Sequence, residues 1–198
     1  MKMMLAVITQ KQWQIKSIDI KTAFLQGEEI DRDIYIKPPS LAKSTPGCIW
    51  KLKKCVYGLA DASLKWYDRV RKFMLSTGGK KASFDPALFL WHKNGELVGI
   101  IGVHVDDFLI SGNKNFHEKT VSKLCSTFLV GKEENRCFRY LGLHLIQEQG
   151  HITLDQNHYT SSLKPITFDQ IHEPADSSLT EVDKDNLRKV TGQLLWVA

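Results

Sequence analysis

The chain has 198 residues, of which 42% are apolar and 25% charged, values that suit a globular protein with one or two domains and a substantial core. No apolar run is long enough to cross a bilayer, and no small-residue cleavage site follows the apolar start, so we expect no membrane span, signal peptide or membrane partner. Of the net charge of +5, residues 41–81 carry +8 and all others together −3, which indicates either a polyanionic partner or a solvated basic helix face.

The spacing of apolar residues predicts the elements in the first part of the chain. Amphipathic spacing favours helices, and apolar residues that alternate with polar ones favour strands. Proline and glycine pairs mark where several of these elements end. In chain order, the expected elements are a helix at 1–10, strands at 13–20 and 34–36, a turn that leads into a short strand within 45–54, and a helix at 58–77.

The second part of the chain is predicted in the same way. We expect a β-hairpin at 96–112 with a pair of aspartates at or near its turn. The remaining expected elements are a helix at 115–130, a strand pair at 138–146 and 151–155, and, from Gln156 onward, helices broken at Pro165 and Pro174, the last at 184–197.

Two adjacent carboxylates interrupt the apolar hairpin in the segment HVDD at 104–107. An unpaired buried charge is so costly that it is normally neutralised or paired. Asp19 ends another apolar strand, so three carboxylates would meet if these strands are neighbours. Hard divalent cations such as Mg²⁺ bind carboxylates together with substrate phosphates, and two ions roughly 4 Å apart promote phosphoryl transfer. Ordinary turn and cap aspartates are the alternative, and HVDD alone favours that alternative.

Longer segments resemble the reverse transcriptases of the Ty1/copia class of LTR retrotransposons. DIKTAFLQGEEIDRDIYIKPP at 19–39 resembles the first catalytic motif of that family, and CVYGLADASLKWY at 55–67 resembles the second, usually YGLKQAPRxWY. HVDD is similar to the YVDD box, which follows the second motif. Downstream blocks of the family resemble FRYLGLHL at 138–145, ITLDQNHY at 152–159 and RKVTGQLLWVA at 188–198. The resemblance therefore covers essentially the whole chain.

This resemblance implies an α+β fold. A polymerase palm with an antiparallel sheet and packed helices would occupy residues 1–150, and a small helical thumb-like or connection-like region would occupy 151–198. The fingers would be largely missing, and the chain would stop before an RNase H domain. We therefore expect a fragment of a Pol polyprotein that polymerises poorly alone, because the fingers help to position the incoming nucleotide.

The resemblance also implies which residues act. Asp19, Asp106 and Asp107 match the catalytic carboxylates, which hold two Mg²⁺ ions, with Mn²⁺ as a substitute. Phe24 matches the aromatic gate against a nucleotide 2′-OH, and core packing is the alternative for such a ring. The other expected substrate-binding positions are a backbone turn near the triphosphate, the second-motif glycine and two residues before the Asp pair, namely Ile20, Lys21, Thr22, Ala23, Gly58, His104 and Val105.

Basic residues in and around the second motif match the nucleic-acid track of the family. Contacts of this kind with phosphates supply affinity without sequence readout. The implied partners are an RNA or DNA template with its primer, dNTPs, and other Pol domains such as integrase and RNase H. The implied location is intracellular and cytoplasmic, or a virus-like particle if the element is active. The expected nucleic-acid-binding residues are Lys51, Lys53, Lys54, Lys65, Arg69 and Lys72.

Several positions depart from the family pattern. His104 replaces the Tyr of YVDD, which affects how the primer terminus is positioned. Ala60, Asp61 and Ser63 replace Lys, Gln and Pro, and an acid at 61 is unfavourable near phosphates unless it faces away. The complete triad favours RNA-directed DNA polymerisation. The alternatives are an inactive palm remnant that only binds nucleic acid, and a different Mg²⁺-dependent phosphoryl-transfer enzyme.

Cysteines and histidines give weaker indications. None of the four cysteines is in a CxxC pair, which argues against a zinc knuckle and is typical of free thiols in an intracellular protein. His144, His151 and His158 recur every seven residues. Strands and a loop separate them, so we interpret them as surface histidines and not as a metal cluster.

Overall fold

The computed structural model describes residues 1–45, 47–165 and 181–197, which form a mixed α/β fold with three antiparallel sheets. Within these ranges, no helix is long and apolar enough to cross a membrane. The elements are α1 (Lys2–Gln10), β1 (Lys16–Ile20), η1 (Ala23–Gln26), β2 (Tyr35–Ile36), β3 (Trp50–Lys51), α2 (Ala62–Ser76), β4 (Lys80–Lys81), β5 (Leu88–Lys93), β6 (Glu96–His104), β7 (Asp107–Gly112), α3 (Lys114–Phe116), η2 (His117–Val121), α4 (Ser122–Thr127), β8 (Val130–Asn135), β9 (Cys137–Tyr140), β10 (Leu143–Glu148), β11 (His151–Asp155), α5 (Asn157–Thr160) and α6 (Glu181–Val197).

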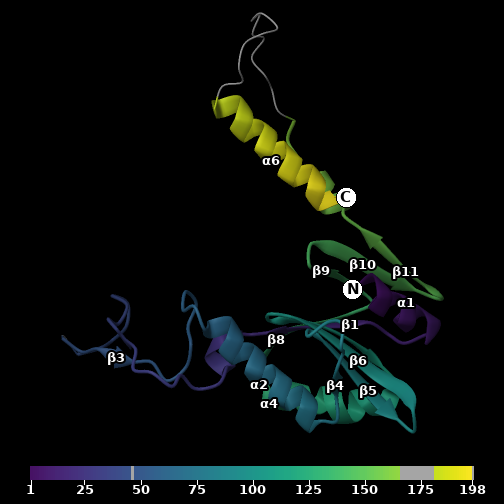
Figure 1. Cartoon of the computed structure of the whole chain (residues 1–198), viewed down its shortest axis with the longest axis horizontal. Coiled ribbons are helices and arrows are strands. Elements are labelled where there is room, and N and C mark those ends of the chain that lie inside the picture. Colours follow the sequence, from purple (N-terminus) through teal and green to yellow (C-terminus); the bar gives the residue numbers. More distant parts are fainter. Residues whose placement is uncertain (46, 166–180, 198) are drawn as a thin grey trace, which may run out of the picture.

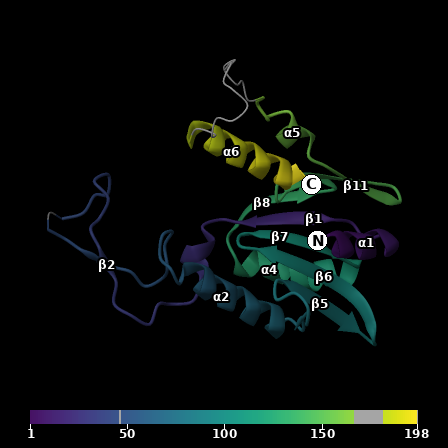
Figure 2. The ribbon, with the colours of Figure 1, turned by 45° about the horizontal axis from the view of Figure 1, so that its top comes forward.

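The largest sheet has six strands in the order β4-β5-β6-β7-β1-β8. Figure 1 labels the outer strands of this sheet, and Figure 2 labels β7 beside β1. β1 comes early in the sequence, yet it lies between β7 and β8 and is antiparallel to both. β6 and β7 form the predicted hairpin. The strand that ends near Asp19 is therefore the neighbour of the hairpin that carries HVDD, as the sequence analysis expects.

Helices cover one face of this sheet. Ile18 and Ile20 of β1 point to the face that α2 and the α3–α4 segment cover (Figure 2), while Asp19 between them points to the other face. On the helix side, the buried rings of Trp66 and Phe108 stack with their centroids 6.4 Å apart. Burial of these large apolar side chains anchors α2 to the strands that carry the aspartates.

The opposite face is partly covered by α1 and the three-stranded sheet β11-β10-β9 (Figure 1). Ile8 of α1, Leu109 of β7 and Leu145 of β10 are buried in this second core. Gln147 adds a polar tie, because its side-chain oxygen accepts a hydrogen bond from the Ile15 N–H at 2.8 Å. The small sheet is thus fixed against the start of β1.

The last helix, α6, extends away from the sheets (Figure 1), and no residue of this described helix is buried. Its C-terminal end meets α5. The Gln156 side-chain amide donates to the Trp196 carbonyl oxygen at 3.0 Å, and the rings of Tyr159 and Trp196 lie 6.4 Å apart. The predicted helix at 184–197 is confirmed, whereas the predicted break at Pro174 lies outside the described residues.

Two central helices differ from the predicted ones. The helix predicted at 58–77 begins only at Ala62, because Gly58 has φ +94° and the residues around it form successive turns. The helix predicted at 115–130 is divided by the π-helical turn η2 between α3 and α4. The first difference matters for the site, because it places Gly58 on an exposed loop and not in a helix.

The sheets contain more strands than the sequence predicts. The segment predicted as one strand at 138–146 forms β9 and β10, because Leu141 and Gly142 both have positive φ and make a tight turn. The sequence prediction also lacks β4, β5 and β8. The helix near 1–10, the strands within 13–20, 34–36 and 45–54, and the hairpin at 96–112 are confirmed with small shifts at their ends.

Candidate active site

Backbone register places Asp19 of β1 directly opposite Asp107 of β7. Directly opposed residues of antiparallel strands project from the same face, with Cβ atoms about 5 Å apart. On its other side, Asp107 pairs with His104 of β6. Asp19, Asp107 and His104 therefore lie in one row across three adjacent strands, on the face opposite to α2. The row has two carboxylates and one imidazole, and we call it the carboxylate row. Strand pairing alone brings together two of the three predicted catalytic carboxylates.

The third carboxylate lies in the turn that joins β6 to β7. Val105 and Asp106 form this turn, and Val105 has φ +53°, a strained conformation for a β-branched residue. The Trp66 indole N–H donates to the Val105 carbonyl oxygen at 2.6 Å, and the Ile20 N–H donates to the Asp106 carbonyl oxygen at 2.8 Å. Trp66 is therefore more than a core residue, because it holds the turn that carries the Asp pair. Its helical spacing predicts burial but gives no sign of this bond.

Mutual repulsion characterises the acidic groups. Burial is the largest cause that raises the pKa of the Asp107 carboxyl; the negative charges of Asp106 and Asp19 raise it further, and His104 acts in the opposite direction. A hard divalent cation would offset the repulsion between these carboxylates, and carboxylate oxygens are the ligands that such a cation prefers. In the described part of the chain, no three Asp, Glu, His or Cys side chains are arranged to hold one metal ion. The donor set is present, but its side chains do not converge in this structure.

A glycine of the neighbouring strand sets the position of Asp19. The β1–β8 register shifts between Asp19 and Ile20, so Gly131 of β8 is the extra residue of a bulge. A Cβ atom at position 131 would overlap the Asp19 Oδ2 atom. Only glycine leaves this space open for the carboxylate. The polar sequence around Gly131 contains no signal that would have identified it as a site residue.

Phe24 lies on η1, directly after β1, and its half-buried ring packs against Tyr57 with ring centroids 4.6 Å apart. Tyr57 is exposed, and the next residue, Gly58, has φ +94° with open space where a Cβ atom would be. The first and second sequence motifs therefore meet at this aromatic pair. The structure brings Phe24 and Gly58 into one neighbourhood and adds Tyr57, which the sequence analysis did not single out.

The backbone turn after β1 is largely committed to the fold. The Ile20 N–H bonds to the hairpin turn, and the Lys21 N–H donates to the Leu129 carbonyl oxygen at 2.9 Å. The Gln26 side chain pairs with the same residue, accepting from the Leu129 N–H at 2.7 Å. Thr22, at φ +51°, then turns the chain so that Ala23 is buried. The Ile20 and Lys21 N–H groups are thus not available to a phosphate in this structure.

Half of the predicted nucleic-acid-binding residues are paired with an acidic segment, residues 28–33. Such exposed pairs are individually weak but neutralise local charge. Asp61, one of the departures from the family pattern, also faces this segment and pairs with Arg32 at 2.8 Å. The three lysine pairs are Lys51 with Asp33 at 2.6 Å, Lys65 with Asp31 at 3.2 Å and Lys72 with Glu28 at 3.0 Å.

The other three predicted nucleic-acid-binding residues differ. Among the residues that the structure describes, Lys53, Lys54 and Arg69 form no ion pair. We call these six predicted residues the basic segment. It divides into a paired set, which is Lys51, Lys65 and Lys72, and an unpaired set, which is Lys53, Lys54 and Arg69. Charge alone, as read from the sequence, does not distinguish the two sets.

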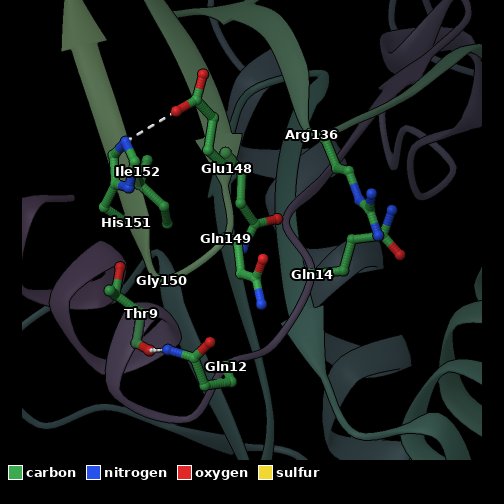
Figure 3. Close-up of a pocket in the computed structure, with 10 residues that line it drawn as sticks. Thr9, Gln12, Gln14, Arg136, Glu148, Gln149, Gly150, His151 and Ile152 are labelled. Carbon is green, nitrogen blue, oxygen red and sulfur yellow. Dashed lines mark hydrogen bonds and ion pairs between the residues drawn. The ribbon is translucent and has the colours of Figure 1, made fainter.

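A polar cavity of about 360 Å³ lies elsewhere, between the end of α1 and the β10–β11 hairpin (Figure 3). Gln14 and Arg136 lie side by side at one wall, and Glu148 pairs with His151 at 3.0 Å at another. No site residue predicted from the sequence lines this cavity. We therefore place the candidate active site at the strand ends that carry the aspartates.

The fold and the site define a class: a mixed α/β protein whose antiparallel sheet presents carboxylates at the ends of neighbouring strands. The chain belongs to the reverse transcriptase (RNA-dependent DNA polymerase) family, because the model of that family matches residues 1–168. This match confirms the resemblance that the motifs indicate, and it includes every residue of the carboxylate row.

Known relatives agree with this assignment. The chain is 29% identical over 214 residues to the retrovirus-related Pol polyprotein from transposon RE1 of Arabidopsis thaliana, and 28% identical over 211 residues to that from transposon RE2 of the same plant. Both matches cover 100% of this chain but only 14% of the relative. A third relative, the putative transposon Ty5-1 protein of Saccharomyces cerevisiae, is 26% identical, with 91% of this chain and 63% of that protein covered. These relatives confirm the resemblance to the Ty1/copia class.

Among solved structures, an apo telomerase from Candida tropicalis, truncated from its C-terminal domain, matches at 14% identity with a TM-score of 0.41. The match covers 75% of this chain and 37% of the telomerase chain. A likeness this low carries no argument about the present chain. The family assignment rests on the sequence comparisons.

Proposed function

We propose that this chain is the palm portion of a Ty1/copia-type reverse transcriptase and adds nucleotides to a primer 3′-OH on an RNA or DNA template. The observation that carries the proposal is the register of Asp19 opposite Asp107, beside Asp106, in a chain of this family. The chain spans 14% of the length of its first relatives. Activity of the whole protein, its template and its other Pol domains, such as integrase and RNase H, are therefore part of the proposal.

Asp19, Asp106 and Asp107 are the residues that would hold Mg²⁺, or Mn²⁺ in its place. The fit rests on the donor set, since the charges of Asp106 and Asp19 both act on the Asp107 carboxyl and hard cations prefer such oxygens. The chemistry that two such ions supply is activation of the attacking hydroxyl and neutralisation of the leaving pyrophosphate. The contribution of the chain itself is position, because Trp66 holds the turn at the strand ends.

Other residues would orient the substrates. Phe24, braced by Tyr57, would exclude a nucleotide 2′-OH, and His104 beside Asp107 would contact the primer terminus. Phe24→Val should then increase incorporation of rNTPs relative to dNTPs in a primer-extension assay. An unchanged ratio would leave Phe24 as a packing residue only.

The decisive experiment compares Asp106→Asn with the unchanged chain in primer extension on a homopolymer template with Mg²⁺. Asp68→Asn on α2, away from the carboxylate row, is the matched control. Mn²⁺ binding followed by electron paramagnetic resonance tests the metal site even if the chain alone extends primers slowly. Extension by Asp106→Asn would contradict the catalytic assignment, and unchanged Mn²⁺ affinity would contradict the metal assignment.

A palm remnant that binds nucleic acid without catalysis is the second candidate. The observation in its favour is that Asp19 lies against Gly131 and the three carboxylates do not converge. Salt-dependent binding of a primer–template, without extension and without Mn²⁺ binding, would support this candidate over the polymerase.

A further inference from the structure

The small sheet β9–β11 carries a nucleophile, a base and an acid on its face away from the core, one from each strand. His144 of β10 is directly opposite Asp155 of β11, and Cys137 of β9 lies diagonally across from His144. Side chains of the alternate residues Phe138 and Leu145 are buried in the second core. The pleat therefore directs Cys137, His144 and Asp155 together to the outer face.

These three side chains are linked in order. His144 Nε2 lies 3.4 Å from Cys137 Sγ, and His144 Nδ1 lies 3.3 Å from Asp155 Oδ2. With its proton on Nδ1, the imidazole donates to Asp155 and leaves the Nε2 lone pair to accept the thiol proton. The second carboxylate oxygen, Asp155 Oδ1, accepts from the Asn157 N–H at 3.0 Å. Asp155 is thus held at both oxygens and orients His144 toward the sulfur.

We propose that Cys137 is an activated thiol, with His144 as its general base and Asp155 as the positioning residue, and that it is a site of modification by small disulfides such as oxidised glutathione. The arrangement of nucleophile, base and orienting acid is the one that activates cysteine elsewhere in proteins. Cys137 is exposed, so a reagent in solution can reach the sulfur. This inference is independent of polymerase activity.

The reaction is a thiol–disulfide exchange. His144 takes the Cys137 proton, the sulfur attacks one sulfur of the disulfide, and a new S–S bond forms as the old one breaks. The leaving glutathione thiolate takes up the proton and departs as a thiol. Cys137 is oxidised to a mixed disulfide, and the departing glutathione sulfur is reduced, so no further oxidant is required.

A small disulfide suits this site better than an acyl substrate or a metal ion. The cavity in Figure 3 is lined by the far end of the same hairpin, from Gln147 to Ile152, and by Arg136, which precedes Cys137 in the chain, but by none of the three residues. Acyl transfer needs a cleft that holds its substrate, whereas disulfide exchange needs only access to the sulfur. Within the described ranges, no three Cys, His, Asp or Glu side chains fit a metal ion.

The effect of nearby charges on the reaction rate of Cys137 must be distinguished from the effect of the general base His144. Arg139 is opposite His144 on the same face, and the Glu148–His151 pair lies at the far end of the hairpin. Oxidised glutathione is an anion, so Arg139 could concentrate it electrostatically. Iodoacetamide is neutral, and a parallel measurement with it therefore reports the thiol chemistry alone.

The test measures the modification rate of each cysteine by peptide mass spectrometry, with oxidised glutathione and with iodoacetamide. Cys48 is also exposed and serves as the internal reference. Cys137 should react about tenfold faster than Cys48 with both reagents. His144→Gln should lower the modification rate of Cys137 to that of Cys48. His158→Gln is the matched control and should leave the rate of Cys137 unchanged.

Positioning is tested separately. Asp155→Asn should slow Cys137 as well, because the amide carries no charge and its N–H can donate to Nδ1, which favours the tautomer with its proton on Nε2. Asp155→Glu should restore most of the rate. Slow reaction of the buried Cys55 in every variant shows that the fold is intact. Equal rates for Cys137 and Cys48 in the unchanged chain, or no effect of His144→Gln, would overturn the proposal.

Discussion

The carboxylate row and the basic segment belong to one candidate site, yet they are held in opposite ways. The row is set by strand register and by a bond from the buried Trp66. The basic segment and the acidic residues 28–33 are joined by ion pairs at the surface, and the two strands of this region, β2 and β3, have only two residues each. The row therefore keeps its geometry as conditions change, whereas the ion pairs of the segment weaken with salt.

Under the proposed function, this difference would give the two regions different parts in binding the substrates. A rigid row suits chemistry, because reacting groups must be held in a narrow geometry. The paired lysines must exchange an internal carboxylate for a phosphate when nucleic acid enters, so each adds less affinity than an unpaired cation does. Under the proposed function, the acidic segment would thus compete with nucleic acid for the paired set.

The largest expected effect is in the rigid region. Trp66→Ala should lower the free energy of unfolding by about 3–5 kcal/mol, because it removes a large buried side chain. Trp66→Phe keeps a ring but leaves the Val105 carbonyl without its donor, at a cost of about 1–3 kcal/mol. Urea unfolding measures both, with Trp50→Phe on exposed β3 as the neutral control. A Trp66→Phe protein as stable as the original would show that the bond to Val105 contributes nothing.

The next effect concerns the paired and unpaired sets of the basic segment. Replacing the unpaired set by Gln should reduce the slope of log affinity against log salt for a primer–template by about 2–3, since three phosphate contacts are lost. Replacing the paired set should reduce it by about 1 or less. Titrations at several salt concentrations measure both triple variants. An equal reduction by both triple variants would show that the acidic segment releases its lysines without cost, and a larger reduction by the paired set would contradict the comparison.

A smaller effect concerns pH. The folded state raises the Asp107 pKa above the ordinary value of 3.8, so it binds this proton more tightly than the unfolded state does. Stability should therefore fall as pH rises from 3.8 through the higher folded pKa, and the loss persists at neutral pH. Asp107→Asn should flatten this dependence and melt at a higher temperature at neutral pH. Melting curves across this range test it, and Asp68→Asn should keep the original profile.

The smallest expected effect is at the bulge. Gly131→Ala should push the Asp19 carboxylate out of its space, which removes a conformation that does not bind metal, and Mn²⁺ affinity should rise about threefold. Stability should change little, because the displaced atom ends a flexible side chain. Gly102→Ala is the control on the same face, where the nearest atom is Met4 Sδ at 3.3 Å. Weaker Mn²⁺ binding by Gly131→Ala would identify the position against Gly131 as the metal-binding one.

The spacing of apolar residues predicts those parts of the site whose position depends on neighbouring residues in the sequence. Asp19 and the HVDD turn were placed at strand ends because apolar residues flank both. The paired and unpaired sets could not be predicted, because charge is visible in a sequence but the partner of each charge is not. The bond from Trp66 to Val105 spans 39 residues, and no periodicity reports such a contact.

β8 and the turn between β9 and β10 escape prediction from the sequence for two different physical reasons. β8 reads VGKEEN and lies at the edge of the sheet, so most of its side chains are exposed and the alternation of apolar residues is lost. Gly131 is part of this strand, and the space for Asp19 was therefore hidden together with it. The turn at Leu141 and Gly142 was missed because a continuous apolar pattern runs through it.

The interior position of β1 also has a consequence for biosynthesis. β1 precedes the other described strands in the sequence, and its partner β7 begins 88 residues after Asp19, at Asp107. At about 5–20 residues per second, a ribosome needs roughly 4–18 s to make the intervening chain. During that interval, the nascent chain displays Ile15, Ile18 and Ile20 without the sheet that buries them. The carboxylate row can therefore form only after β7 has been synthesised. Until then, the apolar side chains of β1 are exposed and can bind other apolar surfaces.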